Sequence, residues 1–266
     1  MNPRLLKTIL KYTLALTSVP LVMSMARADL LDDIRKAGKI RVAIELSLPP
    51  YGMMTDALEP YGSDVDTARL LAQDLGVKLE IVPATGPTRI PFLQTNKADV
   101  VIATLSISPE RAKVIDFSLP YSAVQIVVAA PKSMSIKDYG DLKGKSIAIT
   151  RGNVQEGELM KKAVGAQIVR FDDDATLVTA GVSGQAPIVS TATTLLRTIQ
   201  TKNPARDMET KFVVKNFNLG IGMRKGEPAL LAWLNDWVEK NRADGKLNDI
   251  FRKYHGADLP AISSPS

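Results

Sequence analysis

The 266-residue sequence contains no cysteine and a single histidine, His255. The absence of cysteine excludes disulfides, thiol nucleophiles and metal sites with cysteine ligands. One histidine leaves almost no material for a serine–histidine–aspartate triad or a multi-histidine metal site. We therefore expect no metal, no cofactor and no catalytic residue of these kinds. The composition, 45% hydrophobic and 23% charged, is typical of a globular protein with one or two domains.

Residues 1–28 show the three-part pattern of a secretory signal peptide. Arg4, Lys7 and Lys11 precede an uncharged, mostly apolar stretch over 12–25, and Ala26-Arg27-Ala28 places small residues where a signal peptidase cuts. This stretch is shorter than the ~20 residues that a membrane span needs. We predict export and cleavage after Ala28, with a retained membrane anchor as the alternative.

The charge of the chain depends on this leader. The leader holds four basic residues and no acid, so its removal lowers the net charge from +6 to +2. The remaining chain has no basic stripe with interleaved aromatic residues, which argues against nucleic-acid binding.

The apolar periodicity predicts two α/β units joined without a low-complexity linker. In the first unit, strands at 39–44, 77–82 and 99–105 alternate with helices at 64–75 and 89–95, which indicates a parallel sheet covered by helices. The pattern then restarts. The second unit and the end of the chain have predicted strands at 123–130, 146–150, 167–171, 188–190, 211–215 and 219–223, with helices at 154–164, 174–182, 193–201 and from Pro228 onward.

Several motifs, in their order and spacing, resemble the family 3 periplasmic solute-binding proteins, the polar amino-acid receptors of ABC importers. The resemblance covers nearly all of 38–258. The motifs that carry it are Tyr61-Gly62-Ser63-Asp64-Val65-Asp66, Thr104-Leu105-Ser106-Ile107-Ser108-Pro109-Glu110-Arg111, Asp116-Phe117-Ser118-Leu119-Pro120-Tyr121, Asp141-Leu142-Lys143-Gly144-Lys145 and Met223-Arg224-Lys225-Gly226.

The resemblance implies a two-lobed fold of the type II kind. Lobe 1 would comprise 29–122 and 222–266, and lobe 2 would comprise 123–221. Each lobe would be a mostly parallel sheet flanked by helices, and two crossing strands would form the hinge. The ligand would sit in the cleft and stabilise the closed state. The resemblance also implies a periplasmic location and an inner-membrane ABC importer permease as partner, and we expect a monomer.

The same resemblance implies that Arg111 binds the carboxylate of the ligand, and that Ser106 and Thr104 form hydrogen bonds with its carboxylate and amine. A guanidinium offers a planar fork that matches a carboxylate with two charge-assisted hydrogen bonds. The alternative is a surface arginine at a helix start, paired with Glu110 or Asp116.

Three further lobe 1 residues are candidates for the cleft. Arg89 resembles a ligand-facing arginine of glutamate and aspartate receptors and would suit a second carboxylate; its alternative role is a hydrogen bond to the loop at 84–87. Glu45 lies at the end of the first predicted strand and Tyr51 follows that strand, and ligand-binding groups cluster at such strand ends. The alternative for Tyr51 is packing at the rim of the cleft, and the alternative for Glu45 is a solvent-exposed strand end.

In lobe 2 we name Asn153, Val154, Gln155, Asp174 and Thr191 as candidate ligand residues. The sequence departs from the family at Ala192, where relatives usually place an Asp that pairs the ligand ammonium, and at Leu48 and Gly86, where many place aromatic residues. Asp174 is a candidate replacement for the missing acid. Its alternative role is in a helix N-cap, within Asp172-Asp173-Asp174.

We therefore predict a binding protein that captures a small carboxylate-bearing polar solute, namely an amino acid, with acidic amino acids among the candidates. The alternative is an enzyme on the same fold, because cyclohexadienyl dehydratases resemble this family closely. Such an enzyme needs a positioned acid in the cleft, for which Glu45, Glu156 or Asp174 are candidates. A sensory binding domain is disfavoured by the lack of an attached signalling segment in the sequence.

Overall fold

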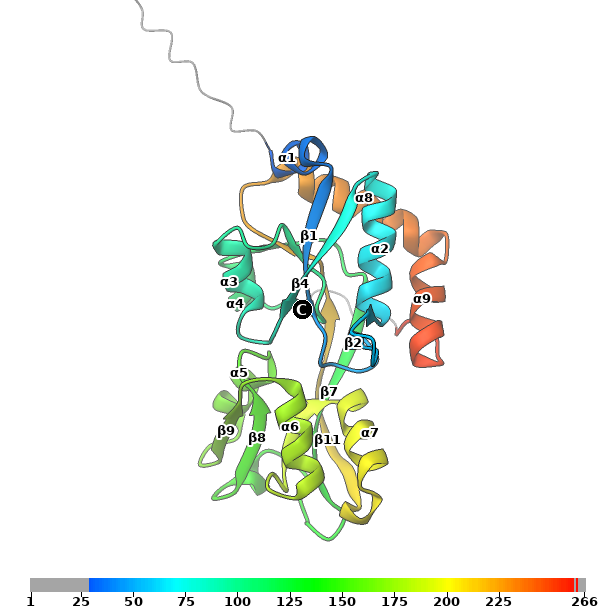
Figure 1. Ribbon diagram of the computed structural model, residues 1–266. Coiled ribbons are helices and arrows are strands. Elements are labelled where there is room, and N and C mark those ends of the chain that lie inside the picture. Colours follow the sequence, from blue (N-terminus) through cyan, green and yellow to red (C-terminus); the bar gives the residue numbers. More distant parts are fainter. Residues whose placement is uncertain (1–28, 261, 263–266) are drawn as a thin grey trace, which may run out of the picture.

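Two five-stranded sheets organise the computed structural model, which describes residues 29–260 and 262. Each sheet forms the centre of one lobe, and the two lobes lie one above the other in Figure 1. The predicted signal peptide over 1–28 lies outside the described residues.

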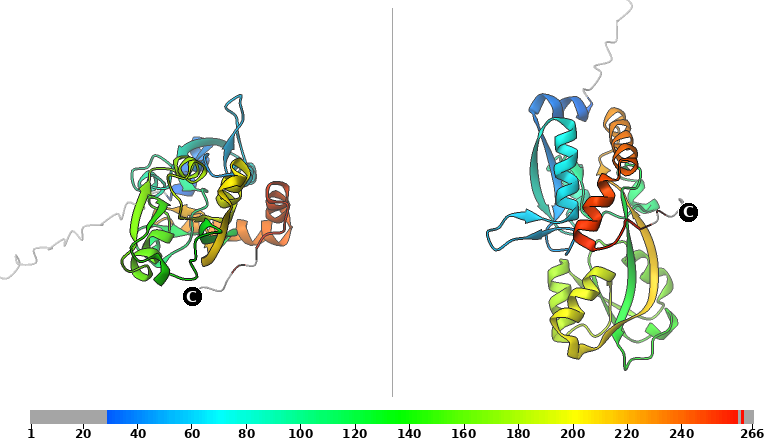
Figure 2. Two further views of the ribbon diagram at one scale, coloured as in Figure 1. Left: turned by 90° about the horizontal axis from the view of Figure 1, so that it is seen from below. Right: turned by 90° about the vertical axis from the view of Figure 1, so that its right-hand side faces the viewer.

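The first lobe is built on a sheet with the strand order β4-β1-β5-β12-β6. Its strands are β1 (Lys39–Glu45), β4 (Lys78–Ala84), β5 (Val100–Val101), β6 (Asp116–Phe117) and β12 (Gly222–Met223). Its helices are α1 (Leu30–Ala37), α2 (Ser63–Leu75), α3 (Arg89–Gln94), α4 (Pro109–Ala112), α8 (Pro228–Ala243) and α9 (Lys246–His255). A hairpin of β2 (Met53–Met54) and β3 (Pro60–Tyr61) projects from this lobe (Figure 2).

Helix α2 illustrates why these segments fold as they do. Val65, Ala68, Leu71 and Ala72 recur at helical spacing and are buried, so one face of the helix packs into the core of the lobe. The helix ends at Gly76, whose φ of 74° is left-handed and therefore suits glycine.

The second lobe is built on a sheet with the strand order β11-β7-β10-β8-β9. Its strands are β7 (Ser122–Pro131), β8 (Ser146–Thr150), β9 (Gln167–Phe171), β10 (Val189–Ala192) and β11 (Met208–Leu219). Its helices are α5 (Gln155–Lys162), α6 (Asp174–Ser183) and α7 (Thr193–Lys202), with 3-10 turns η1 (Gly140–Leu142) and η2 (Pro204–Arg206).

Two long strands carry the chain between the lobes. Strands β7 and β11 pair antiparallel, from Ser122 opposite Leu219 to Pro131 opposite Met208. Both strands run along one side of the molecule and join the lobes there. Elsewhere the two lobes face each other across their junction (Figures 1 and 2). The ends of β1, β5, β8 and β10 are thereby brought toward the junction of the lobes.

The sheets are mixed rather than mostly parallel, which corrects one detail of the predicted fold. Strand β1 pairs parallel with β4 and β5, but β12 pairs antiparallel with β5 and β6. In the second lobe β7 pairs antiparallel with both β10 and β11. The reason is the double crossing, because a segment that returns from the other lobe enters its sheet in the opposite direction.

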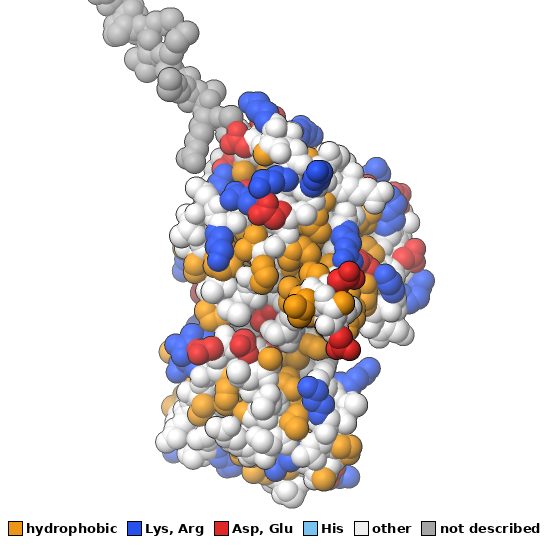
Figure 3. All heavy atoms as spheres, viewed as in Figure 1, with side chains coloured by type: hydrophobic (Ala, Val, Ile, Leu, Met, Phe, Trp, Pro, Cys, Tyr) orange, Lys and Arg blue, Asp and Glu red, His pale blue; other side chains and the backbone are white. Residues whose placement is uncertain are grey.

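Most predicted elements are present. Strand β11 runs beyond the predicted strand over 211–215 at both ends and includes Leu219, and most other differences fall on short elements. The predicted strand over 99–105 shrinks to β5, and the chain turns shortly after it at Thr104, whose φ of 49° is left-handed. Helices α1 and α4, strand β6 and the β2–β3 hairpin had no sequence prediction. Among the described residues no helix has the length and apolar character of a membrane span. Basic and acidic side chains are intermixed on the face seen in Figure 3.

Candidate functional site

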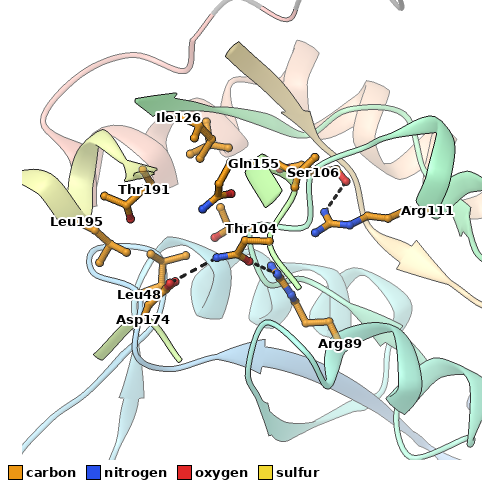
Figure 4. Close-up of a pocket in the computed structure, with 14 residues that line it drawn as sticks. Leu48, Arg89, Thr104, Ser106, Arg111, Ile126, Gln155, Asp174, Thr191 and Leu195 are labelled. Carbon is orange, nitrogen blue, oxygen red and sulfur yellow. Dashed lines mark hydrogen bonds between the residues drawn. The ribbon is translucent and has the colours of Figure 1, made fainter. Parts of the chain in front are cut away.

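A pocket lies where the two lobes meet and takes side chains from both (Figure 4). Nine of the eleven predicted site residues line it. The lining residues are Leu48, Arg89, Thr104, Ser106, Arg111, Val124, Ile126, Asn153, Val154, Gln155, Asp174, Thr191, Ala192 and Leu195.

Arg111 projects into this pocket from the short helix α4, whose N-terminus is capped by the Ser108 hydroxyl. The residue is 9% exposed. Its Nη1 donates to the Ser106 carbonyl at 2.8 Å and its Nη2 donates to the Gly152 carbonyl of the other lobe at 2.9 Å. The remaining N–H groups have no hydrogen-bond partner among the described residues, so they are available to a ligand. Burial, with a smaller contribution from Arg89, lowers the pKa of Arg111 to about 9, which leaves it charged at neutral pH.

Thr104 is held in its left-handed conformation by the buried carboxylate of Asp64 on α2. The backbone N–H and the hydroxyl of Thr104 both donate to Asp64 Oδ2, at 2.8 and 3.0 Å. The Tyr121 hydroxyl donates to Asp64 Oδ1 at 2.9 Å. Burial raises the pKa of Asp64 to about 6, although these hydrogen bonds oppose the shift. Asp64 was named from the sequence only within a motif, and its supporting role was not predicted.

Arg89 is buried at 2% exposure and bonds to both lobes. Its Nε donates to the Gly86 carbonyl and its Nη1 to the Ala103 carbonyl, at 3.3 and 2.9 Å. Its Nη2 donates to the Asn153 side-chain oxygen of the second lobe. The residue therefore lines the pocket and also makes the loop hydrogen bond that was its alternative role.

Glu45, at the end of β1, lies behind Arg89 and does not line the pocket. It is 1% exposed, its carboxylate is 3.8 Å from Arg89 Nη1, and its two oxygens accept no hydrogen bond from a described residue. Burial, together with the nearby charge of Asp174, raises the pKa of Glu45 to about 8. The alternative of a solvated strand end is therefore wrong.

Two roles were considered for Asp174, a ligand residue and a helix N-cap, and the structure assigns them to different residues of the aspartate triplet. Asp173 caps α6 by accepting from the backbone N–H of Thr176 at 2.7 Å. Asp174 is 2% exposed and lines the pocket. Its Oδ1 accepts from the Thr150 hydroxyl and from Asn153 Nδ2, whereas its Oδ2 accepts no hydrogen bond from a described residue. Burial raises the pKa of Asp174, and the Thr150 hydrogen bond and Arg89 oppose this shift.

The rest of the second lobe's contribution comes from the start of α5 and the end of β10. Gln155 is 2% exposed, donates to the Ser190 carbonyl at 3.1 Å, and has a buried Oε1 without a partner among the described residues. Val154, Thr191 and Ala192 also line the pocket, so Ala192, where the family resemblance implied an acid, borders the space for a ligand.

Tyr51 is placed away from this pocket, contrary to the cleft position that we predicted. It is 3% exposed, and its ring packs edge-on against His255 of α9 at 4.6 Å. It borders a separate small pocket with Asp64 and Tyr121. The chain turns at Pro49-Pro50 and directs this large apolar ring into the core instead of the cleft.

Four aliphatic lining residues were not among the predicted site residues: Leu48, Val124, Ile126 and Leu195. All four are buried at 6% exposure or less. An apolar residue at the surface of a pocket has the same sequence signal as a core residue. Only Leu48 had been noted, as a departure from the aromatic residue of relatives.

The lobes touch directly beside the pocket, at Gly86 of the first and the turn at 151–153 of the second. A Cβ atom on Gly86 would lie 2.6 Å from the Arg151 carbonyl oxygen. The hydrogen bonds from Arg89 to Asn153 and from Arg111 to Gly152 cross the same junction. Within the described part of the chain no group of His, Asp and Glu is arranged to hold a metal ion.

Comparisons with known proteins agree with this architecture. Residues 40–257 match the model of the bacterial extracellular solute-binding proteins, family 3. The L-cystine-binding protein TcyJ of Escherichia coli K12 is 30% identical over 240 residues, which cover 90% of each chain. The ABC transporter glutamine-binding protein GlnH of Bacillus subtilis is 28% identical and covers 86% of this chain and 85% of its own.

A crystal structure with the same fold bears on the enzyme alternative. The ancestral amino acid-binding protein AncCDT-1, a precursor of cyclohexadienyl dehydratase, superposes with a TM-score of 0.75 and 32% identity, covering 85% of this chain and 99% of its own. It is described as a binding protein, as are TcyJ and GlnH. On the family match and these similarities, this chain belongs to the bacterial extracellular solute-binding proteins, family 3.

Proposed function

We propose that this protein captures an α-amino acid between its lobes and delivers it to an ABC importer. The observation that carries the proposal is the Arg111 guanidinium, buried in the pocket between the lobes with N–H groups still free for a ligand. A carboxylate is the group that best matches such a fork. The names of TcyJ and GlnH support an amino acid as the ligand and an ABC importer as the partner.

Asp174 takes the ammonium group in this proposal. Asp174 lines the pocket, its Oδ2 accepts no hydrogen bond from a described residue, and Ala192 offers no acid. Thr104 and Ser106 border the carboxylate end, and Asn153, Gln155 and Thr191 supply neutral polar groups from the second lobe. A buried ammonium without a counterion would cost several kcal/mol, so Asp174 is needed for binding.

The chemistry of a dehydratase is not part of the proposal. The relatives named above are binding proteins, and AncCDT-1 is itself an amino acid-binding protein. The acidic ligand that Arg89 suggested is also set aside, because three of its five N–H groups, including Nε, already donate to protein oxygens, whereas Arg111 keeps its Nε–H and one N–H on each Nη.

The proposal also includes export of the protein and the residue ranges of its two lobes. Cleavage after Ala28 would release the chain into the periplasm as a monomer without affinity for nucleic acid. Residues 29–122 and 222–266 would belong to one lobe and residues 123–221 to the other. N-terminal sequencing of the exported protein tests the cleavage position.

Substitution of Arg111 tests the proposed function. We expect Arg111→Ala to weaken amino-acid binding about 100-fold, because breaking a buried charge pair costs on the order of 2–5 kcal/mol. Arg111→Lys keeps the charge but loses the fork and should bind with intermediate affinity. Isothermal titration calorimetry with the best ligand of an amino-acid panel gives the dissociation constants.

The matched control is Arg151→Ala, which removes an exposed arginine at the same junction that pairs with Asp172 instead of lining the pocket. It should bind like the parent protein. Unchanged affinity in a folded Arg111→Ala protein would contradict the proposed carboxylate site.

A further inference from the structure

The two arginines of the pocket lining lie apart from three of its aliphatic residues, which share their side of the pocket with Asp174 (Figure 4). Arg89 and Arg111 lie on one side in Figure 4, and Leu48, Ile126 and Leu195 lie on the other. These three aliphatic side chains are 4%, 6% and 1% exposed. A ligand whose carboxylate meets Arg111 therefore directs its side chain toward aliphatic groups.

We infer that the ligand is an α-amino acid whose side chain carries no charge. This inference rests on the proposed function, because it assigns the carboxylate of the ligand to Arg111 and its ammonium to Asp174. It adds the chemistry of the third substituent, which neither the family nor the relatives decide.

A cationic side chain finds no partner in this pocket. Asp174 is the one carboxylate among the described lining residues, and the ligand ammonium already uses it. Glu45 lies behind Arg89, outside the lining, and faces that guanidinium at 3.8 Å. A second buried cation would remain without a counterion, which is strongly unfavourable.

An anionic side chain is excluded for a related reason. Three of the five N–H groups of Arg89 donate to Gly86, Ala103 and Asn153, and the residue lies on the same side as Arg111 in Figure 4, away from the aliphatic groups. Arg111 serves the ligand carboxylate. A second carboxylate at the far side of the pocket would therefore meet aliphatic groups and the carboxylate of Asp174, and no cation.

Two pairs of amino acids with matched shapes test the inference on the protein without residues 1–28. Lysine and norleucine differ in the terminal ammonium, and glutamate and glutamine differ in charge at equal size. After a thermal-shift screen of the common L-amino acids and norleucine, calorimetry at pH 7 measures the four affinities. We expect an uncharged amino acid as the tightest ligand, and the charged member of each pair to bind at least tenfold more weakly than its partner.

The outcomes separate this inference from the proposed function. A charged amino acid as the tightest ligand, or a charged member that equals its uncharged partner, overturns the inference but leaves amino-acid capture in place. The absence of any response across the whole panel overturns both.

A variant with a new carboxylate tests the physical reason. Ala192 lines the pocket, whereas the next residue, Thr193, is half-buried and borders a different groove. We expect Ala192→Asp to raise the affinity for lysine relative to norleucine at least tenfold, and Thr193→Asp to leave this ratio unchanged. An unchanged ratio in an Ala192→Asp protein that unfolds at the parent temperature contradicts the inference that missing counterions exclude cations.

Discussion

At the scale of single residues, Glu45 shows most clearly how burial disfavours the charged form of a carboxyl group. Its two oxygens lack hydrogen bonds from described residues, and the nearest cation, Arg89, is 3.8 Å away. Asp174 and Asp64 add negative potential, so the folded protein holds a proton on Glu45 up to about pH 8. The unfolded chain releases that proton near pH 4.5. Between these values the folded state binds more protons, and the free energy of unfolding falls as the pH rises.

We predict that the free energy of unfolding decreases between pH 7 and 8, by at most about 1.4 kcal/mol per pH unit for one proton. Asp64, with a pKa of about 6, and His255, whose burial lowers its pKa to about 4, change little in this window. Glu45→Gln should remove most of the slope in urea titrations at several pH values. Glu80→Gln, an exposed position on neighbouring β4, should keep it. Parallel pH profiles of the parent and Glu45→Gln proteins would refute the assignment.

At the scale of secondary-structure elements, helix α2 positions the loop that enters the pocket. Asp64 in its first turn fixes Thr104 through two hydrogen bonds, at a φ of 49° that costs a threonine free energy. We predict that Asp64→Asn weakens amino-acid binding at least tenfold, because a neutral amide has one accepting oxygen in place of two and loses the charge-assisted hydrogen bonds. Calorimetry on the folded variant measures this effect.

A matched control exists on the same helix. Asp74 accepts hydrogen bonds from Trp237 and Asn241 at 2.9 and 3.2 Å and lies outside the pocket lining. Asp74→Asn should lower stability by about 1–3 kcal/mol without changing affinity. Equal affinities for the Asp64→Asn and parent proteins would show that Asp64 supports the lobe but not the site.

At the scale of the whole molecule, closure depends on the absence of a side chain at Gly86. A Cβ there would lie 2.6 Å from the Arg151 carbonyl oxygen of the other lobe, too close for real atoms. We predict that Gly86→Ala keeps the lobes further apart, weakens amino-acid binding about tenfold, and enlarges the radius of gyration of the ligand-saturated protein in small-angle X-ray scattering.

The control is Gly157→Ala on helix α5, where an added Cβ meets no atom within 4 Å. Helix propensity favours alanine there by about 1 kcal/mol, so this variant should be slightly more stable and close normally. If the Gly86→Ala protein binds and compacts like the parent, the contact at the junction is not required for closure.

The sequence by itself predicted the family, the two-lobed fold, most of the longer helices and strands, and Arg111 as a pocket residue. Apolar periodicity and the motif from Thr104 to Arg111 are both features of continuous stretches of sequence, so they can be recognised without the tertiary structure. The short elements β5, β6 and β12 were harder to predict, because two-residue strands have no periodicity of their own.

Only the tertiary structure decided which side chains meet. It placed Glu45 behind Arg89, turned Tyr51 into the core, and brought the aliphatic residues Leu48 and Leu195 to one pocket. It also showed that Gly86 lets the lobes touch. These relations join segments far apart in sequence across a junction made by two crossing strands, and residue type alone does not reveal which buried groups face a pocket and which face the core.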